Sequence, residues 1–392
     1  MLRGIIFDMD GVIINSEPVH FKIWEETLAA RGIRLDWEIY KPCIGATINV
    51  LMEILHKNYG IDREDESLIE EMKVNKERTI KEQGIPPVEG AVDLIRRLKS
   101  QGFHMAVASS SPMYYIKQVM HALQIETCFD VLVSGEYVKH PKPAPDIFWE
   151  AAKRMDLSPE ECLVIEDSGN GCKAARAADM ICAAYYNPDS GEQNLGPAHV
   201  VMEGYEEIDR SFLEKVYCHG RHIPYTICET ERLILKEMTE KDIPVLISIV
   251  KEDEEFKDAV IDVEEEIRNF ASYRRYMYEM CDMGYWLILE KEGGTIIGSV
   301  GFEPKLWNQK DTVVELGYQI ACDKRRQGFA YEACRAALEQ AENRGADHIY
   351  CRIRKENTAS IKLAEKLGFT VAEGDQKDFG DSIRIFRYAC GQ

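Results

Sequence analysis

Two aspartates separated by a single residue, Asp8 and Asp10, follow the apolar run Gly4–Phe7 and precede Gly11. The apolar run predicts a buried strand, and side chains alternate along a strand, so both carboxylates can point the same way. Gly11 allows the backbone to turn sharply where the strand ends. Two carboxylates this close repel each other unless a cation lies between them. The pattern therefore predicts a metal-dependent phosphoryl-transfer centre, and the alternative is a loop with two solvated aspartates.

Polar residues also follow each of three later apolar runs. These are Ser109 and Ser110 after Phe103–Ala108, Lys142 after Val131–Ser134, and Glu166 with Asp167 after Cys162–Ile165. Helical patterns separate the runs, which predicts a parallel sheet whose strands all end at the same edge. We therefore expect these side chains to converge on Asp8 and Asp10.

The four motifs, in this order, resemble the haloacid dehalogenase superfamily over roughly residues 1 to 215. The resemblance implies an α/β fold with a Rossmann-like parallel sheet. It implies that Asp8 attacks phosphorus to form an aspartyl-phosphate, while Asp10 protonates the leaving group and then activates water. Ser109 would hydrogen-bond a phosphate oxygen, and Lys142 would pair with Asp8 and the phosphoryl group. The implied Mg²⁺ ligands are Asp8, Asp10, Glu166 and Asp167.

The segment between the first two strands has the apolar spacing of helices, beginning with Ser16–Arg31. It resembles the small helical cap of the beta-phosphoglucomutase-like branch, here residues 15–87, inserted between core segments 1–14 and 88–217. The resemblance implies substrate contacts from His20, Gly45, Lys76 and Ser110, although a histidine at a helix start is often a surface residue. Asn15 stands where relatives usually carry aspartate, which affects the expected hinge movement of the cap.

The cap also bears on the choice between a phosphatase and a phosphomutase, because both use the same four motifs. A mutase needs positive charge on the cap to hold a second phosphate, and the loop Pro42–Asn49 contains no arginine. Lys76 is the available substitute. We therefore favour a phosphatase acting on a small phosphorylated metabolite and keep the mutase as the alternative.

The second half predicts another α/β domain, residues 227–392, after a linker at 218–226. Its sheet is expected to be mostly antiparallel, built from Glu231–Lys236, Trp286–Glu290, Ile296–Phe302 and Val313–Ile320. The stretch Arg325–Tyr331 then opens a helix with small residues, where backbone amides form an anion-binding nest.

This stretch, together with Asn357–Ser360 and Ala364–Phe369, resembles the GNAT acetyltransferases. The resemblance implies acetyl-CoA binding through Arg325, Gln327, Gly328, Phe329, Ala330, Asn357 and Ser360. Glu315 is the candidate base that takes a proton from an amine acceptor, and Tyr318 is a distant candidate for the acid that protonates the thiolate. A domain that binds acetyl-CoA without transferring it, and regulates the phosphatase, is a further alternative.

Composition limits the partners and the compartment. The 392 residues carry a net charge of −20, which argues against nucleic acid and anionic membranes as partners. No apolar run approaches the roughly 18 residues that a membrane span needs, so we expect a cytoplasmic protein. Twelve cysteines without a C-x-x-C pair give no sign of a zinc site. The sequence therefore predicts a bifunctional enzyme, and the fusion suggests that both halves act on one amino-bearing metabolite.

Overall fold

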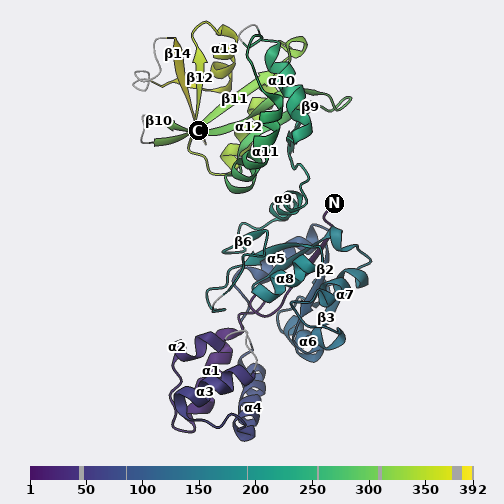
Figure 1. The fold of residues 1–392 in the computed structure, drawn as a ribbon, viewed down its shortest axis with the longest axis vertical. Coiled ribbons are helices and arrows are strands. Elements are labelled where there is room, and N and C mark those ends of the chain that lie inside the picture. Colours follow the sequence, from purple (N-terminus) through teal and green to yellow (C-terminus); the bar gives the residue numbers. More distant parts are fainter. Residues whose placement is uncertain are drawn as a thin grey trace. The chain divides into compact units, whose positions relative to one another are not determined.

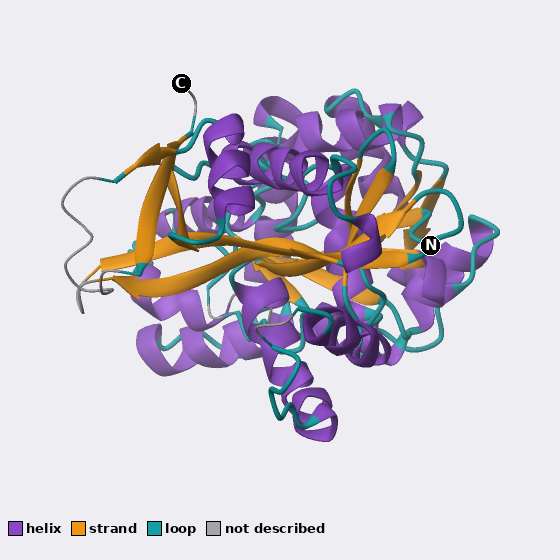
Figure 2. Cartoon of the chain, turned by 90° about the horizontal axis from the view of Figure 1, so that it is seen from above, coloured by secondary structure: helices purple, strands orange, loops and turns teal. Residues whose placement is uncertain are grey.

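The computed structural model describes residues 1–392 except 44–47, 85, 192, 254–255, 308–310, 373–381 and 391–392. The chain divides into two units, Met1–His222 and Ile223–Gln392, and each is described by itself (Figure 1). Each unit has its own sheet, drawn in orange in Figure 2, with helices around it. Among the described residues, no helix has the length and apolar character needed to cross a membrane.

The first unit contains a six-stranded parallel sheet in the order β3-β2-β1-β4-β5-β6. Its strands are β1 (Gly4–Phe7), β2 (His104–Ser109), β3 (Val131–Ser134), β4 (Cys162–Glu166), β5 (Ile181–Tyr185) and β6 (Val200–Met202). Strand β1 lies between β2 and β4, and Phe7 is in register with both Val107 and Ile165. Asp8 therefore leaves the sheet between the ends of β2 and β4, which confirms the predicted parallel α/β core and its converging strand ends.

Helices cover both faces of this sheet. They are α5 (Ala91–Ser100), α6 (Met113–Ala122), α7 (Asp146–Arg154), α8 (Gly169–Ala177) and α9 (Arg210–Gly220). Because side chains alternate along β1, Ile5 and Phe7 join one apolar cluster with Leu94 and Ile116. Ile6 joins the other cluster, on the opposite face. The near-continuous apolar strands are thus buried on both sides, as a parallel sheet requires.

Four helices between β1 and the rest of the sheet form a separate bundle (Figure 1). They are α1 (Glu17–Ala29), α2 (Trp37–Tyr40), α3 (Ile48–Tyr59) and α4 (Glu66–Gln83). The bundle has its own apolar core, which includes Trp24, Leu28 and Leu55. Its two connections to the sheet lie side by side, because the amide of Asn15 donates to the Pro86 carbonyl at 2.9 Å. These helices form the predicted cap.

The second unit contains an eight-stranded sheet in the order β13-β14-β12-β11-β10-β9-β8-β7. Its strands are β7 (Thr226–Glu229), β8 (Leu233–Glu237), β9 (Gly284–Glu290), β10 (Ile296–Trp307), β11 (Asp311–Ile320), β12 (His348–Arg354), β13 (Thr370–Val371) and β14 (Ile383–Ala389). Its helices are α10 (Ile243–Lys251), α11 (Val263–Tyr273), α12 (Phe329–Asn343) and α13 (Thr358–Leu367). Strand β11 pairs in parallel with β12 only at Val314 and Glu315, and the other pairings are antiparallel. The mostly antiparallel sheet confirms the prediction for this half.

Short single turns complete the two units. Those of 3₁₀ type are Lys41–Cys43, Glu126–Cys128, Gly135–Tyr137, Pro159–Glu161, Glu240–Asp242 and Cys322–Lys324, and Arg274–Met280 is a π-helix.

The end of the first unit differs from the sequence-based expectation. Helix α9 continues to Gly220, so the first part of segment 218–226, which was expected to be a linker, is helical. A Cβ at Gly220 would lie 2.6 Å from the Ile181 Cδ1 atom. The glycine therefore lets the last turn of α9 pack closely on β5, and that packing outweighs the low helix propensity of glycine.

Tyr205 offers a test of how the loop after Asp10 is supported. Its buried ring stacks on Tyr185 with centroids 4.5 Å apart, and its hydroxyl donates to the Val12 carbonyl at 3.1 Å. We expect Tyr205→Phe to lower the unfolding free energy of the first unit by about 1–3 kcal/mol, because a buried carbonyl loses its donor. Scanning calorimetry of the full chain would measure this, with Tyr114→Phe, whose side chain is exposed, as the neutral control. An unchanged transition in Tyr205→Phe would contradict the assigned support.

Candidate active sites

Lys142 lies between two buried carboxylates at the end of β1. Its ammonium group donates to Asp8 Oδ1 at 2.5 Å, to Glu166 Oε1 at 2.7 Å and to the Ala108 carbonyl at 3.2 Å. Burial lowers the pKa of Lys142, but Asp8 and Glu166 outweigh it and hold that pKa above its usual range. Burial also raises the pKa of Asp8 to about 7, against the opposing charge of Lys142. The structure thus brings together three of the predicted residues, with the positive charge of Lys142 between the carboxylates of Asp8 and Glu166.

Asp10 lies on the β2 side of this centre. Its Oδ2 atom accepts from the Ser111 hydroxyl at 2.8 Å and from the Ser109 hydroxyl at 3.5 Å. The Ser109 hydroxyl in turn accepts from the Ser111 amide at 3.0 Å, while Ser110 is exposed. Sequence reasoning selected Ser109 and Ser110 and missed Ser111. The available signal was the run of three hydroxyl residues after β2.

Asp167 and Glu166 leave β4 in different directions. Asp167 Oδ2 accepts from the Ser190 hydroxyl at 2.8 Å and lies so close to Gly11 that a Cβ there would overlap it. Burial raises the pKa of Asp167 well above its usual value, and the charges of Glu166 and Asp8 add to this. The Glu166 oxygens are both engaged, because Oε1 accepts from Lys142 and Oε2 accepts from the Ser168 amide at 2.7 Å.

Only some of the predicted magnesium ligands have carboxylate oxygens that are available to a metal ion. Across the described part of the chain, no group of three or more His, Cys, Asp or Glu side chains is arranged to hold a metal. Mg²⁺ in phosphoryl-transfer sites is commonly held by one or two carboxylates, with water and substrate oxygens as the other ligands. Asp8 and Asp167 meet that need, because both are buried and close enough to raise the pKa of Asp167. Glu166 is committed to Lys142 and Ser168, and the Asp10 carboxylate is held by serines.

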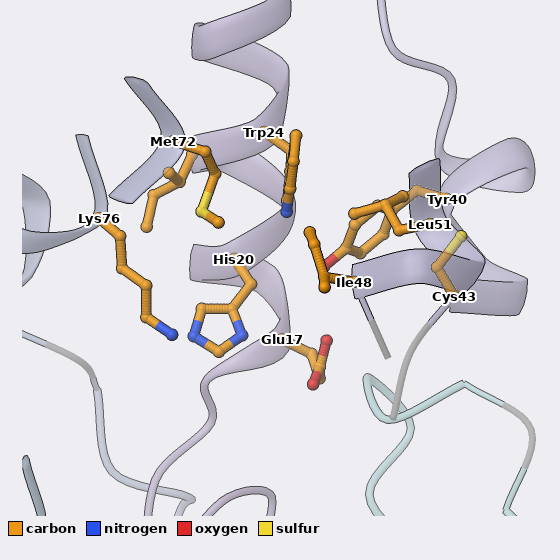
Figure 3. Close-up of a pocket in the computed structure, with 10 residues that line it drawn as sticks. Glu17, His20, Trp24, Tyr40, Cys43, Ile48, Leu51, Met72 and Lys76 are labelled. Atoms are coloured by element: carbon orange, nitrogen blue, oxygen red, sulfur yellow. The ribbon is translucent and has the colours of Figure 1, made fainter. Parts of the chain in front are cut away.

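A pocket of about 320 Å³ lies among the cap helices of the first unit (Figure 3). His20 and Lys76, two of the residues predicted to contact substrate, line this pocket, whereas Gly45 lies outside the described residues. Burial and the Lys76 charge lower the pKa of His20 to about 3, so the imidazole is neutral near pH 7. Burial lowers the pKa of Lys76, while Asp10 and Glu17 oppose that shift. Glu17 also lines the pocket, and sequence reasoning had not selected it.

In the second unit, the predicted acetyl-CoA loop lies at the amino terminus of α12. Gly328 caps that helix with φ of +87°, and Phe329 and Ala330 form its first turn. The Arg325 side chain donates to the Ile320 carbonyl at 2.9 Å and to Asp253 Oδ2 at 3.0 Å. Gln327 Nε2 donates to the Asp323 carbonyl at 2.8 Å. These two side chains therefore hold the shape of the loop rather than extending from it.

Arg326 is the residue of this loop that sequence reasoning overlooked. Its φ is +60° and its side chain is exposed. It makes no hydrogen bond or ion pair with any residue whose placement the structure describes. A free guanidinium beside the amino terminus of a helix is suited to an anionic ligand. Its signal in the sequence was only its place beside Arg325.

The remaining predicted residues lie where β11 and β12 separate after Glu315 and Tyr350. Asn357 caps α13 by accepting from the Ser360 amide at 3.0 Å. The Ser360 hydroxyl hydrogen-bonds the Tyr318 hydroxyl at 2.8 Å, and burial raises the pKa of Tyr318 to about 12.

Glu315 is less available than predicted. Its two carboxylate oxygens accept from Arg352 Nε at 2.8 Å and Arg352 Nη2 at 2.7 Å. To act as a base it would have to leave this two-pronged ion pair, so the geometry favours a structural role for Glu315.

Comparisons with known proteins match the two units of the chain to different families. Residues 2–179 match the model of the haloacid dehalogenase-like hydrolases, and residues 232–370 match that of the acetyltransferase (GNAT) domain. Fructose-1-phosphate phosphatase YqaB of Escherichia coli K12 is 34% identical over 178 residues, which cover 45% of this chain and 93% of that protein. A phosphorylated carbohydrates phosphatase of Thermotoga maritima is 29% identical, with 53% and 96% covered. CbbY from Rhodobacter sphaeroides, solved with phosphate, is 26% identical with a TM-score of 0.46, and the match covers 53% of this chain and 96% of that one.

Gly171, in the first turns of α8, tests the packing around Glu166. A Cβ at this position would overlap the Glu166 carboxylate, which Lys142 and Ser168 hold in place. Alanine is normally favoured over glycine within a helix, but we expect Gly171→Ala to destabilise the first unit by about 1–3 kcal/mol through overpacking.

Gly204→Ala is the matched control for this substitution, because no atom lies within 4 Å of its added Cβ. The measurement is the calorimetric transition of the first unit. A stabilised Gly171→Ala protein would show that Glu166 is not held as the structure places it.

Proposed function

Because the chain belongs to the haloacid dehalogenase-like hydrolase family and its residues 232–370 match a GNAT acetyltransferase domain, we propose a specific pair of activities for this enzyme. Residues 1–217 hydrolyse a small phosphorylated metabolite, and residues 227–392 transfer an acetyl group from acetyl-CoA to an amine. The observation that carries the first activity is the position of Lys142, which holds Asp8 at the end of β1. Names of the relatives favour a phosphorylated sugar or sugar-like compound as substrate.

The proposed phosphatase reaction has two steps. An Asp8 oxygen attacks phosphorus, the ester oxygen leaves, and Asp10 supplies the proton that the leaving oxygen needs. Asp10 then takes a proton from water, which attacks the phosphorus of the aspartyl-phosphate, so that inorganic phosphate leaves and Asp8 is restored. Lys142 offsets the negative charge of Asp8, and Ser109 is placed to donate to a phosphoryl oxygen. The Ser111 hydroxyl, 2.8 Å from Asp10 Oδ2, orients the acid.

Asp8 and Asp167 are the residues that would hold magnesium. The ion, when bound, supplies positive charge that reduces the repulsion between an anionic nucleophile and an anionic substrate. We assign Glu166 to the support of Lys142, because both of its oxygens are engaged within the protein.

The pocket supports hydrolysis over phosphoryl transfer within a bisphosphate. Lys76 is the single cation among the described residues that line it, since His20 is neutral. A mutase has to bind the second phosphate of its bisphosphate intermediate, and one lysine offers limited compensation for the negative charge of that phosphate. Water is therefore the proposed acceptor of the phosphoryl group.

For the second activity, the amides at the start of α12 and the Arg326 guanidinium are the proposed site for the acetyl-CoA pyrophosphate. The Tyr318 hydroxyl, whose pKa burial raises to about 12, keeps its proton near pH 7. Together with Ser360 it is the proposed proton donor to the departing thiolate. Asn357, which caps α13 beside Ser360, keeps this pair in place.

The fusion supports the proposal that both activities serve one amino-bearing metabolite.

A reducing compartment such as the cytoplasm would suit the chain, because its twelve cysteines are free thiols.

Asp8→Asn tests the phosphatase proposal. We expect wild-type protein with Mg²⁺ to release phosphate from members of a panel of phosphorylated sugars, amino sugars and amino acids. Loss of the nucleophile should reduce the rate by at least about a thousandfold. Asp93→Asn, an exposed change on α5, is the matched control and should retain the wild-type rate. Isomerisation of sugar phosphates without net phosphate release would instead establish the mutase.

Arg326→Gln tests the acetyl-CoA proposal. Loss of a charged contact to phosphate should weaken acetyl-CoA binding by about tenfold or more in titration calorimetry. Arg335→Gln, also exposed and on α12, should leave the affinity unchanged. Equal affinities for wild type and Arg326→Gln would contradict the assigned site. Binding without CoA release from any of a broad set of amines would favour a regulatory domain over a transferase.

A further inference from the structure

The pocket among the cap helices contains a carboxylate that no described residue binds through a hydrogen bond or ion pair. Glu17 begins α1 and faces the pocket (Figure 3). Within the described residues it makes no hydrogen bond or ion pair, and its interactions are through-space charges from Asp10 and Lys76. The first turn of a helix favours a negative charge, but it does not explain why the carboxylate faces the pocket. A half-buried acid that faces a pocket, with no partner among the described residues, is a candidate ligand-binding group.

The pocket has a positive side and a negative side. Figure 3 shows the Lys76 ammonium group on one side of the His20 ring and the Glu17 carboxylate on the other. Lys76 Nζ also lies 5.9 Å from the centre of the Tyr115 ring, which belongs to α6 of the core. The two charges are not paired with each other. Lys76 therefore complements the anionic part of a substrate, and Glu17 is left for a part of opposite charge.

Two aromatic side chains also line the pocket. Trp24 and Tyr40 both line this space, and Tyr40 is close enough for the Glu17 charge to contribute to its raised pKa, after burial. A carboxylate that faces such a pocket can bind a protonated amine through a charge-assisted hydrogen bond.

We propose that the phosphorylated substrate of the first unit carries a protonated amine, which Glu17 binds in this pocket. This inference rests on the proposed phosphatase function and names the substrate class within it. The amine remains on the product after the phosphate is removed. That product belongs to the class of acceptor that an N-acetyltransferase requires.

The proposal also sets the order of the two reactions. Acetylation converts a cationic amine into a neutral amide, which can no longer pair with the Glu17 carboxylate. Removal of the phosphate therefore comes first and acetylation second. Burial raises the pKa of Glu17 to about 7, with Asp10 adding to the shift and Lys76 opposing it. A bound cation would favour the ionised carboxylate and so would be bound more tightly than a neutral group.

Titration calorimetry on the full chain with Asp8→Asn, which blocks turnover, tests this recognition. The ligands are matched on two scaffolds: glucosamine, glucose and N-acetylglucosamine 6-phosphates, and 3-aminopropyl and 3-hydroxypropyl phosphates. We expect the amine on at least one scaffold to bind about tenfold or more tightly than its hydroxyl partner. On the sugar scaffold, the acetamide should bind no better than the hydroxyl compound.

Glu17→Gln, added to the same background, should abolish the preference while changing the affinity for the hydroxyl compounds by less than about threefold. Glu26→Gln is the matched control, because Glu26 lies on α1 but is exposed and near Lys22. This variant should retain the preference for the amine. A preference absent on both scaffolds, or one that survives Glu17→Gln, would overturn the inference.

Phosphate release by the wild-type chain separates this inference from the proposed function. Release from neutral phosphomonoesters, without an amine preference in binding, would overturn the amine site and leave the phosphatase intact. A Glu17-dependent amine preference without phosphate release from any ligand would uphold the amine site and overturn the phosphatase.

Discussion

The ion pair that Lys142 makes with Asp8 and Glu166 is the constraint on which the first unit depends. Burying a carboxylate without a partner is costly, and removing one partner from a buried ion pair typically costs about 3–5 kcal/mol. Lys142 allows two acids to be buried at the end of the central strands. The proposed reaction needs an attacking oxygen at this place that is exposed to substrate and shielded from bulk water. Asp167 adds a further buried acid, and its raised pKa reflects the excess of negative charge. A divalent cation is the natural means of balancing that excess.

In the proposed reaction, the cap contributes substrate selectivity and the core contributes the chemistry. Asn15, at the connection between the two, donates to Asp189 Oδ2 at 2.6 Å, and the neighbouring Ser190 donates to Asp167. One loop of the core thus contacts both the cap connection and the acid proposed to hold magnesium. The position of the pocket is in this way tied to the same groups that position the reacting centre.

The site residues that lie near the ends of the parallel strands could be predicted from the sequence. Asp8, Ser109, Lys142 and Asp167 each follow an apolar strand, and parallel strands end at one edge. Glu17 and Ser190 could not be predicted, because their roles depend on which way a helix start or a loop turns a side chain. Glu315 illustrates the same limit, since its strand was predicted correctly but Arg352, on β12, engages its carboxylate. Arg326 was overlooked because the resemblance pointed to its neighbours, whose side chains turn back into the loop.

The central claim is that the acid held by Lys142 is the group that receives phosphorus. Mass spectrometry of protein quenched in acid during turnover of p-nitrophenyl phosphate would test this most directly. We predict one phosphoryl group on the peptide that contains Asp8, lost on treatment with hydroxylamine as an acyl phosphate should be. The account would be contradicted if the phosphoryl group were found on another residue during turnover. It would also be contradicted if turnover gave no phosphorylated peptide under conditions that trap acyl phosphates.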